Sequence, residues 1–446
     1  MTLTTRPGDA QPTLATQPLH IPTSRRQFDY DVAIVGLGYV GLPTALAFHS
    51  TGSRVLALDI SQRRISAIRS GDVDLLDVDH RRLAATVGDE EGWLLTDEPA
   101  ELVRAAAIVI CVPTPVDSHL TPDLTMLKSA CAMVVDVAVS GQLIMLTSTT
   151  YVGSTEDLIV EPLRSRGHEI GHDVFVAFSA ERIDPGNARF DHDEVPRVMG
   201  AATPQCEELA FDLLSRSTKN VHRVHSLAAA EMTKLLENTF RAVNIALANE
   251  FADICNTLDI PVTEVIDAAA TKPYGFMKFS PGPGVGGHCI PCDPHYLLWQ
   301  LREQRVAAPV ITSAMTEIAA RPHRIVARAK ESLAGIGVPP AGARVLVVGV
   351  TYKPDVADLR ESPALEILAG LHSEGSVVAF LDPHASALEL HDGTVVERVD
   401  DPVAFDPDLV LLHTRHSDAD LSWVRPDQLV LDATYREVGV GQRIVP

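Results

Sequence analysis

The sequence predicts an α/β protein with two Rossmann-like, doubly wound domains that are joined by a long central helix and a helical dimerisation domain. A strand, a glycine-rich turn, a helix and a second strand follow one another over residues 30–59. An almost breaker-free stretch from Leu227 to about Leu258 would form a helix on the order of 45 Å long. A second alternation of apolar strands and helices begins at Ala343.

Length, charge and cysteine content narrow the classes of function. The chain has 446 residues and a formal net charge of -22, so it repels nucleic-acid backbones and we expect no nucleic-acid partner. No apolar run reaches the ~18 residues of a membrane span, so we expect no membrane partner. Residues 1–29 lack a sustained apolar period and are expected to form a disordered arm. Six scattered cysteines are not a disulfide framework and fit a reducing cytoplasm.

The first strand–turn–helix unit predicts a dinucleotide site. Gly36 permits a tight turn, Gly38 lets backbone N–H groups approach a pyrophosphate, and Gly41 allows close packing of helix against strand. Asp59 ends the next strand, 23 positions after Gly36, where an acid can bind a ribose hydroxyl. This acid disfavours a 2′-phosphate, so NAD is expected rather than NADP. Arg64 suggests the opposite preference, unless it is a solvated helix charge.

Two threonines follow later strands of the same domain. Thr114 comes after the apolar run 106–112, and Thr149 after the run 143–148. Ligands of open α/β sheets lie at the carboxyl ends of strands, so both are candidates for the cofactor and reaction face. The alternative is that each is an ordinary turn residue.

The long helix carries a polar stripe. Lys234, Asn238 and Arg241 are spaced four and three residues apart and share one face. Two cations and an amide on one stripe can form an anion or oxyanion site. The alternative is a solvated face with ordinary pairing, such as Lys234 with Glu231 or Glu237.

A loop crowded with Gly and Pro, residues 281–295, leads to Cys289. The turn-like backbone would make this cysteine accessible as a nucleophile, and Asp293 could orient water or take a proton. Three alternatives stay open from spacing alone. Cys289, Cys292 and His295 have the spacing of zinc ligands, the two cysteines could form a redox pair, and the loop could be merely structural.

The C-terminal unit also ends its strands in polar residues. Its expected strands cover residues 344–349, 377–381, 409–413 and 428–432. Tyr352, Lys353 and Arg360 cluster after the first of these strands, where a uridine or pyrophosphate could bind. The unit lacks a full glycine fingerprint, so a nucleotide different from that of the first unit is expected.

Taken together, these segments resemble the UDP-glucose/GDP-mannose dehydrogenase family over residues 30–446. The matching motifs are Gly36-Leu-Gly-Tyr-Val-Gly41, Val112-Pro-Thr-Pro115, Glu181-Arg-Ile-Asp-Pro-Gly186, Lys234-x-x-x-Asn238, Gly286-Gly-His-Cys289 and Tyr352-Lys353…Arg360-Glu-Ser-Pro363. The resemblance implies an NAD-binding domain at 30–222, a central helical domain with the cysteine loop at 223–330, and a UDP-sugar domain at 340–446. It also implies a homodimer or higher homo-oligomer.

The resemblance further assigns roles to residues. It implies that Cys289 forms a thioester during a two-step, four-electron oxidation of the C6 alcohol of a UDP-sugar, with no metal ion. The other catalytic residues would be Lys234, Asn238, Asp293, Thr149 and Glu181. The cofactor residues would be Gly36, Gly38, Tyr39, Val40, Gly41, Asp59, Arg64, Thr114, Thr149 and Arg360. The substrate residues would be Arg182, Ile183, Lys234, Asn238, Arg241, Lys272, Gly286, Tyr352 and Lys353, with Lys272 reaching a neighbouring subunit.

Within this family, the segments 234–245 and 268–276 resemble the branch that acts on UDP-N-acetylhexosamines. UDP-N-acetylglucosamine is the first expectation, UDP-N-acetylmannosamine the second and UDP-glucose the third. Three departures concern the sugar more than the chemistry. Ala180 stands where the family usually has proline, residues 319–322 lack the usual Asn and Met, and His295 replaces a common aromatic residue. A non-catalytic sensor of NAD or nucleotide sugars would not need Cys289 together with the polar stripe.

Overall fold

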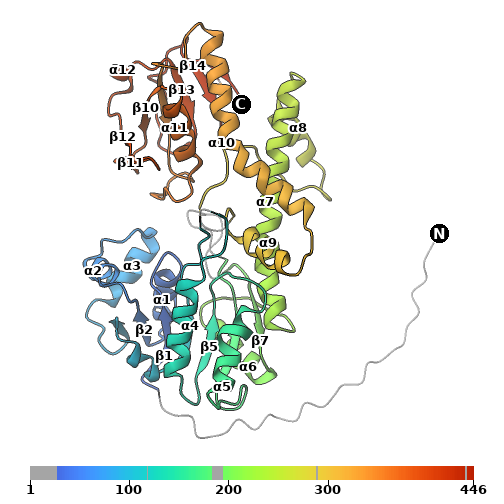
Figure 1. Ribbon diagram of the computed structural model, residues 1–446. Helices are drawn as coiled ribbons and strands as arrows, with labels where there is room; N and C mark the ends of the chain where they lie inside the picture. Colours follow the sequence, from blue (N-terminus) through green and yellow to red (C-terminus); the bar gives the residue numbers. More distant parts are fainter. Residues whose placement is uncertain (1–27, 118, 183–193, 288–289, 437–438) are drawn as a thin grey trace, which may run out of the picture.

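The computed structural model describes residues 28–117, 119–182, 194–287, 290–436 and 439–446. Figure 1 shows two α/β bodies, one at each end of the molecule, with long helices running beside and between them. The two predicted α/β domains are thus confirmed. The predicted arm lies outside the described residues up to position 27. No helix among the described residues is both long enough and apolar enough to cross a membrane.

The N-terminal body contains an eight-stranded sheet in the order β3-β2-β1-β4-β5-β6-β7-β8. Its strands are β1 (Tyr30–Val35), β2 (Val55–Leu58), β3 (Trp93–Thr96), β4 (Ala105–Ile110), β5 (Leu143–Leu146), β6 (Phe175–Phe178), β7 (Arg197–Ala201) and β8 (Val221–Arg223). The pairs are parallel except β6 with β7, which is antiparallel. At the carboxyl edge, Val35 lies level with Leu58 and Ile110, so the loops after these strands emerge together.

Helices cover both faces of this sheet. They are α1 (Gly41–Ser50), α2 (Gln62–Ser70), α3 (Asp77–Thr86), α4 (Thr125–Val137), α5 (Glu161–Ser165) and α6 (Pro204–Leu214), with short turns η1 (Pro99–Arg104) and η2 (Glu156–Val160). One apolar core joins the sheet to α4, η2 and α5, and a second joins its other face to α1, α2, α3 and α6. Strands buried on both faces explain why their sequences are continuous apolar runs.

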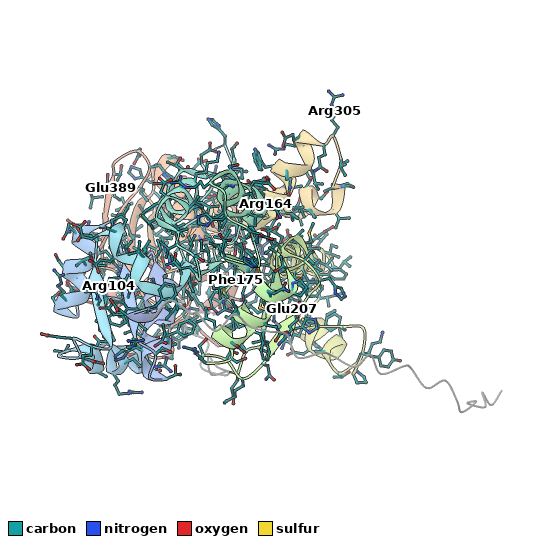
Figure 2. The ribbon with its side chains drawn as sticks, turned by 90° about the horizontal axis from the view of Figure 1, so that it is seen from below. Arg104, Arg164, Phe175, Glu207, Arg305 and Glu389 are labelled. Carbon is teal, nitrogen blue, oxygen red and sulfur yellow. The ribbon has the colours of Figure 1, made fainter. Side chains whose placement is uncertain are left out.

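The central part is built on α7 (Leu227–Thr257), which has 31 residues and confirms the predicted long helix. The Ser226 hydroxyl accepts a hydrogen bond from the Ala229 N–H at 3.1 Å and caps its first turn. The other helices are α8 (Val262–Ala270), α9 (Asp293–Glu303) and α10 (Pro309–Gly335). Helices α9 and α10 pack with α7 around a small apolar core. Arg305, just beyond α9, projects away from the body of the molecule (Figure 2).

The C-terminal body contains a five-stranded parallel sheet in the order β10-β9-β13-β14-β15. Its elements are β9 (Arg344–Val348), α11 (Pro363–Ser373), β10 (Val377–Leu381), β11 (Ala387–Glu389), β12 (Val395–Glu397), α12 (Pro402–Phe405), β13 (Leu409–Leu412), β14 (Leu429–Asp432) and β15 (Gln442–Ile444). The C-terminal half of α10 packs on this sheet together with α11. Because α10 also packs against α7, it holds the C-terminal body over the carboxyl ends of the N-terminal strands.

Candidate active site

The turn after β1 has the backbone geometry of a dinucleotide site. Gly36 has φ +88°, and a Cβ there would lie 2.8 Å from the Cys111 carbonyl oxygen. A Cβ on Gly41 would overlap the Gly36 carbonyl oxygen, so α1 can approach β1 this closely because Gly41 has no side chain. A Cβ on Gly38 would meet no atom within 4 Å, which leaves the ligand face of the turn open. The chain therefore fits a pyrophosphate at the N-terminus of α1.

Asp59 closes the turn at the end of β2. Its carboxylate accepts hydrogen bonds from the backbone N–H groups of Leu37 at 2.8 Å and Ser61 at 2.9 Å. The residue is only partly buried, so its remaining acceptor positions can bind a ribose. Arg64 donates from Nε to the Leu37 carbonyl at 2.7 Å, so in this structure it braces the turn.

One cleft brings together predicted residues from all three parts of the chain. It lies between the glycine turn, the loops after β4 and β5, helix α7 and the C-terminal body. Its lining residues are Gly38, Tyr39, Val40, Cys111, Val112, Pro113, Thr114, Thr147, Ser148, Thr149, Glu181, Lys234, Asp293, Tyr352 and Arg360. Five of the predicted cofactor residues other than Thr149 and four of the predicted catalytic residues thus face a common space; they are Gly38, Tyr39, Val40, Thr114 and Arg360, and Thr149, Glu181, Lys234 and Asp293.

Arg360 links the C-terminal body to the glycine turn across this cleft. Its guanidinium lies 4.8 Å from the centre of the Tyr39 ring, and the Tyr39 hydroxyl donates to Asp74 at 2.6 Å. Asp358 binds Arg360 through both of its carboxylate oxygens. Burial and the Asp74 carboxylate raise the pKa of Tyr39, and hydrogen bonding to Asp358 raises the pKa of Arg360. Tyr39 therefore stays neutral and Arg360 stays charged at the rim of the cleft.

Asp293, the first residue of α9, is the best-placed acid–base group. It is buried, and the Asn238 side-chain amide donates to its Oδ2 atom. Burial raises its pKa to about 6, while the charge of Lys234 and the Asn238 hydrogen bond act in the opposite direction. A carboxyl group with this pKa can exchange protons near neutral pH. Lys234 and Asn238 lie one turn apart on α7, as the spacing predicts.

The two glutamates proposed as ordinary partners of Lys234 have other partners. Glu231 is buried and accepts hydrogen bonds from the loop 153–155, including the Gly153 N–H at 2.6 Å and the Thr155 N–H at 2.9 Å. Glu237 binds the Arg182 guanidinium. Glu231 therefore fixes the loop after β5 to α7. Sequence reasoning missed this role, because the two segments are more than 70 residues apart.

Glu181 and Arg182 follow β6 at the back of the cleft. Glu181 is buried and its carboxylate is paired with Arg197 of β7, a partner that the sequence analysis did not identify. The Arg182 N–H donates to the same carboxylate at 2.7 Å. The Arg182 side chain turns to Glu237 instead of lining the cleft. Ile183 lies outside the described residues.

The cysteine loop is described on both sides of its predicted nucleophile. Cys289 and its neighbour 288 lie outside the described residues. Upstream, a Cβ on Gly286 would lie 2.6 Å from the Tyr352 Cβ atom, so this glycine packs tightly against the C-terminal body. Downstream, Cys292 and His295 are buried. The group of three neighbouring metal-ligating side chains found among the described residues is Asp355, His384 and His416, which includes neither of them.

A second cleft lies between the start of the cysteine loop and the carboxyl ends of the C-terminal strands. It is lined by Pro281, Gly282, Pro283, Gly284, Tyr352, Pro354, Pro363, His413, Thr414, Arg415, Thr434 and Arg436. Tyr352 lines both clefts, and Lys353 follows it. Sequence reasoning missed Arg415 and Arg436, although their position just after β13 and β14 could have indicated them.

Two predicted substrate residues lie away from both clefts of this chain. Arg241 is exposed on α7, three residues beyond Asn238. Lys272 lies 5.1 Å from the Tyr274 ring centre in an exposed segment after α8. A single chain therefore does not bring these two cations to the first cleft.

The fold and the two clefts define a dehydrogenase with separate domains for a dinucleotide and for a second nucleotide. The chain belongs to the UDP-glucose/GDP-mannose dehydrogenase family. The NAD-binding domain of that family matches residues 30–218, its central domain matches residues 228–318, and its UDP-binding domain matches residues 346–435. The protein is thus an NAD-dependent nucleotide-sugar dehydrogenase, which confirms the predicted family, class of enzyme and cofactor.

Curated relatives and solved structures agree with this assignment. The chain is 34% identical over 392 residues to UDP-N-acetyl-D-glucosamine 6-dehydrogenase of Pseudomonas aeruginosa, covering 87% of this chain and 91% of that protein. It is also 34% identical over 395 residues to UDP-N-acetyl-D-mannosamine dehydrogenase of Escherichia coli K12, covering 85% and 92%. The solved UDP-D-ManNAc dehydrogenase of Pyrococcus horikoshii superposes with a TM-score of 0.83 at 30% identity, covering 93% and 98%.

Proposed function

We propose that the protein oxidises the C6 alcohol of a UDP-N-acetylhexosamine to the uronic acid, with UDP-N-acetylglucosamine as the first candidate. UDP-N-acetylmannosamine is the second candidate and UDP-glucose the third. The observation that carries the proposal is the first cleft, where Asp293 and Lys234 line the same space as Gly38 of the glycine turn, and Asn238 donates to Asp293 from behind. Relatives whose names specify N-acetylglucosamine and N-acetylmannosamine match equally well in identity, which favours the N-acetylhexosamine class.

The second cleft is the proposed seat of the UDP part of the substrate. Arg415 and Arg436 line it and can bind a diphosphate by charge-assisted hydrogen bonds. Tyr352 lies at the junction of the two clefts, so a ligand that reaches across it places its sugar near Asp293. These local cations allow an anionic ligand to bind although the whole chain is acidic.

The residues of the first cleft would carry out the proton transfers. NAD, when bound, accepts the electrons that leave the alcohol carbon. The ionised Asp293 carboxylate can take the alcohol proton directly or through water. The Lys234 ammonium and the Asn238 amide can stabilise the negative charge that develops on the substrate oxygen. Thr149 and Glu181 line the same space and can hold a water molecule.

The second oxidation would proceed through Cys289. Its thiolate would add to the aldehyde carbon to give a thiohemiacetal, and oxidation of that carbon, with a second NAD as hydride acceptor, would give a thioester. Water then attacks the thioester, which releases the carboxylic acid and returns the free thiol. Asp293 begins α9 four residues beyond Cys289 and can accept the proton of the attacking water.

We also infer that the protein functions as a homodimer through α7. An exposed apolar stripe follows this helix with a spacing of three, four or seven residues. It consists of Met232, Leu236, Phe240, Leu247, Phe251, Ile254 and Leu258. Leu236 is 63% exposed, which is costly for a leucine in a lone chain. A second copy would cover this stripe and could bring Lys272 to its partner's site. The cysteines are scattered along the chain, and Cys111, Cys131, Cys206 and Cys255 are buried thiols, which fits a cytoplasmic location.

An assay of NADH formation over a panel of UDP-sugars tests the proposed function. We expect two NADH per UDP-N-acetylhexosamine consumed and a uronic acid as product. Cys289→Ala should bind NAD normally but form no acid. One NADH per sugar, with the aldehyde as final product, would overturn the thioester route. Stoichiometric zinc that is lost in Cys292→Ala would support the metal alternative instead.

A further inference from the structure

Arg321 of α10 is a buried cation that the proposed chemistry does not use. Its side chain is 1% exposed, and no other described side chain of that size is buried so completely. Burying a guanidinium is costly unless its N–H groups are satisfied. Arg321 lies just before Pro322, in the segment where the sequence departs from the family pattern. Its contacts therefore need an explanation.

The Arg321 guanidinium binds three separate parts of the chain. Nε donates to the Gly282 carbonyl at 3.1 Å, in the cysteine loop. One terminal nitrogen donates to Asp253 Oδ1 of α7 at 2.6 Å, and the other to the Tyr435 hydroxyl at 2.6 Å. The three bonds leave from three different nitrogens of a rigid planar fork, whereas the three N–H groups of an ammonium all leave from one nitrogen and cannot reach acceptors this far apart.

Two of these partners belong to opposite walls of the second cleft. Gly282 lines the wall formed by the cysteine loop, and its N–H is held by Asn249 Oδ1 of α7 at 2.9 Å. Tyr435 lies between Thr434 and Arg436, which line the wall formed by the C-terminal body. Tyr435 has φ +58°, an unfavourable conformation for a residue with a side chain, so its position depends on its contacts.

We propose that Arg321 is a positioning residue that fixes the two walls of the second cleft relative to each other and so sets the affinity for the UDP part of the substrate. This inference rests on the proposed function, because it assigns that cleft to UDP. Arg321 does not line the first cleft, so NAD binding is independent of it. The ion pair with Asp253 holds the Arg321 guanidinium against α7. The hydrogen bonds to Gly282 and Tyr435 then hold each wall at a fixed distance from α7.

The test compares Arg321→Lys with a matched control, Arg324→Lys. Arg324 lies one turn further along α10 and binds the other oxygen of Asp253 at 3.0 Å. Its other partner is Glu317 of the same helix, and it is not among the residues that line the second cleft. Arg321→Lys keeps the charge opposite Asp253 and loses the bonds to Gly282 and Tyr435. We expect the Kd for UDP, measured by calorimetry, to rise roughly tenfold, which corresponds to a loss of ~1.4 kcal/mol of binding free energy. The Kd for NAD and kcat should stay within about twofold, and Arg324→Lys should change neither Kd.

Tyr435→Phe keeps the test decisive if Arg321→Lys fails to fold. It removes the hydroxyl that accepts from the Arg321 guanidinium and donates to the Pro446 carbonyl at 3.2 Å. We expect about threefold weaker UDP binding, because Arg321 keeps its bonds to Gly282 and Asp253. In the double variant, Tyr435→Phe should add nothing to Arg321→Lys, because both break the same link. Unchanged UDP affinity in the variants that fold, or equal losses for UDP and NAD, would overturn the inference. If wild type binds UDP but oxidises no UDP-sugar, the proposed function fails while the role of Arg321 is still tested.

Discussion

The two α/β bodies share the same strand–turn–strand geometry, but the acid at the turn is accessible to a ligand in the first body and buried in the second. In each, a glycine with positive φ follows the first strand, and its N–H donates to the last residue of the neighbouring strand. Gly36 donates to Leu58 at 2.9 Å, and Gly349 donates to Leu381 at 2.8 Å. The next residue of that neighbouring strand is an aspartate in both bodies, Asp59 and Asp382. Its carboxylate accepts N–H groups of the turn.

The surroundings of the two aspartates differ. Asp59 is partly exposed and open on its ligand side. Asp382 is fully buried and accepts from the Val350, Thr351 and His384 N–H groups, and the His416 ring binds it at 3.0 Å. His416 thus occupies an acceptor position of Asp382, whereas the corresponding carboxylate of Asp59 binds two backbone N–H groups. The same backbone motif is therefore a ligand site only where the acid keeps a free acceptor.

The comparison predicts that the same substitution damages different properties in the two bodies. Asp382→Asn puts an amide among donors in a buried site, so we expect a loss of about 3 kcal/mol or more in the free energy of unfolding. Asp59→Asn should leave stability almost unchanged and raise the KM for NAD by ~10-fold or more, because the ribose loses its acceptor. Thermal unfolding and NADH kinetics measure the two effects.

Asp355→Asn is the control for the first of these variants. Asp355 is an exposed neighbour of His416, so its loss should cost little stability. If Asp382→Asn weakened NAD binding as strongly as Asp59→Asn does, the proposal that only the aspartate of the first body serves the cofactor would be wrong.

A second prediction concerns acid stability. Hydrogen bonds from His416 and the backbone lower the pKa of Asp382 to about 2, against the opposing effect of burial. A carboxyl whose pKa is lower in the folded state stabilises the fold above its unfolded pKa of ~3.9 and loses this contribution as pH falls toward 2. We expect Asp382 to account for about 2 kcal/mol of this loss. Urea unfolding of wild type at pH 5 and pH 2.5 measures it, and the drop should be smaller in Asp382→Asn.

Much of the first body, and the long central helix, could be predicted because their signals are local. The turn from Gly36 to Gly41, the acid after β2 and the length of α7 depend on residues that lie close together in sequence. The contacts that complete the site were not predictable in this way. Arg197 binds Glu181 and His416 binds Asp382 through chain folding over 16 and 34 positions. A cation or histidine in isolation does not show which distant carboxylate it will meet.

A third prediction uses another buried aspartate, Asp293, which accepts from Asn238 among the described residues, whereas Asp382 accepts from four groups. Its pKa is raised to about 6, so it becomes ionised only as pH rises through that value. If the ionised form takes the substrate proton, kcat/KM should rise about tenfold per pH unit below 6 and level off above it. Asp293→Asn should remove this limb together with most of the activity. If the rise of kcat/KM below pH 6 persisted in Asp293→Asn, another group would be responsible for the titration.

The smallest expected effect concerns Arg64, which braces the open turn of the first body through the Leu37 carbonyl. Arg64→Gln should raise the KM for NAD by about two- to threefold, because one hydrogen bond to the turn is lost while Asp59 stays in place. The ratio of kcat/KM for NAD to that for NADP should change little, since in this structure the guanidinium supports the turn. If the substitution instead abolished a measurable NADP activity and left NAD unaffected, Arg64 would face the 2′ position. The two bodies would then differ in a ligand-binding cation, Arg64, as well as in the accessible carboxylate of Asp59.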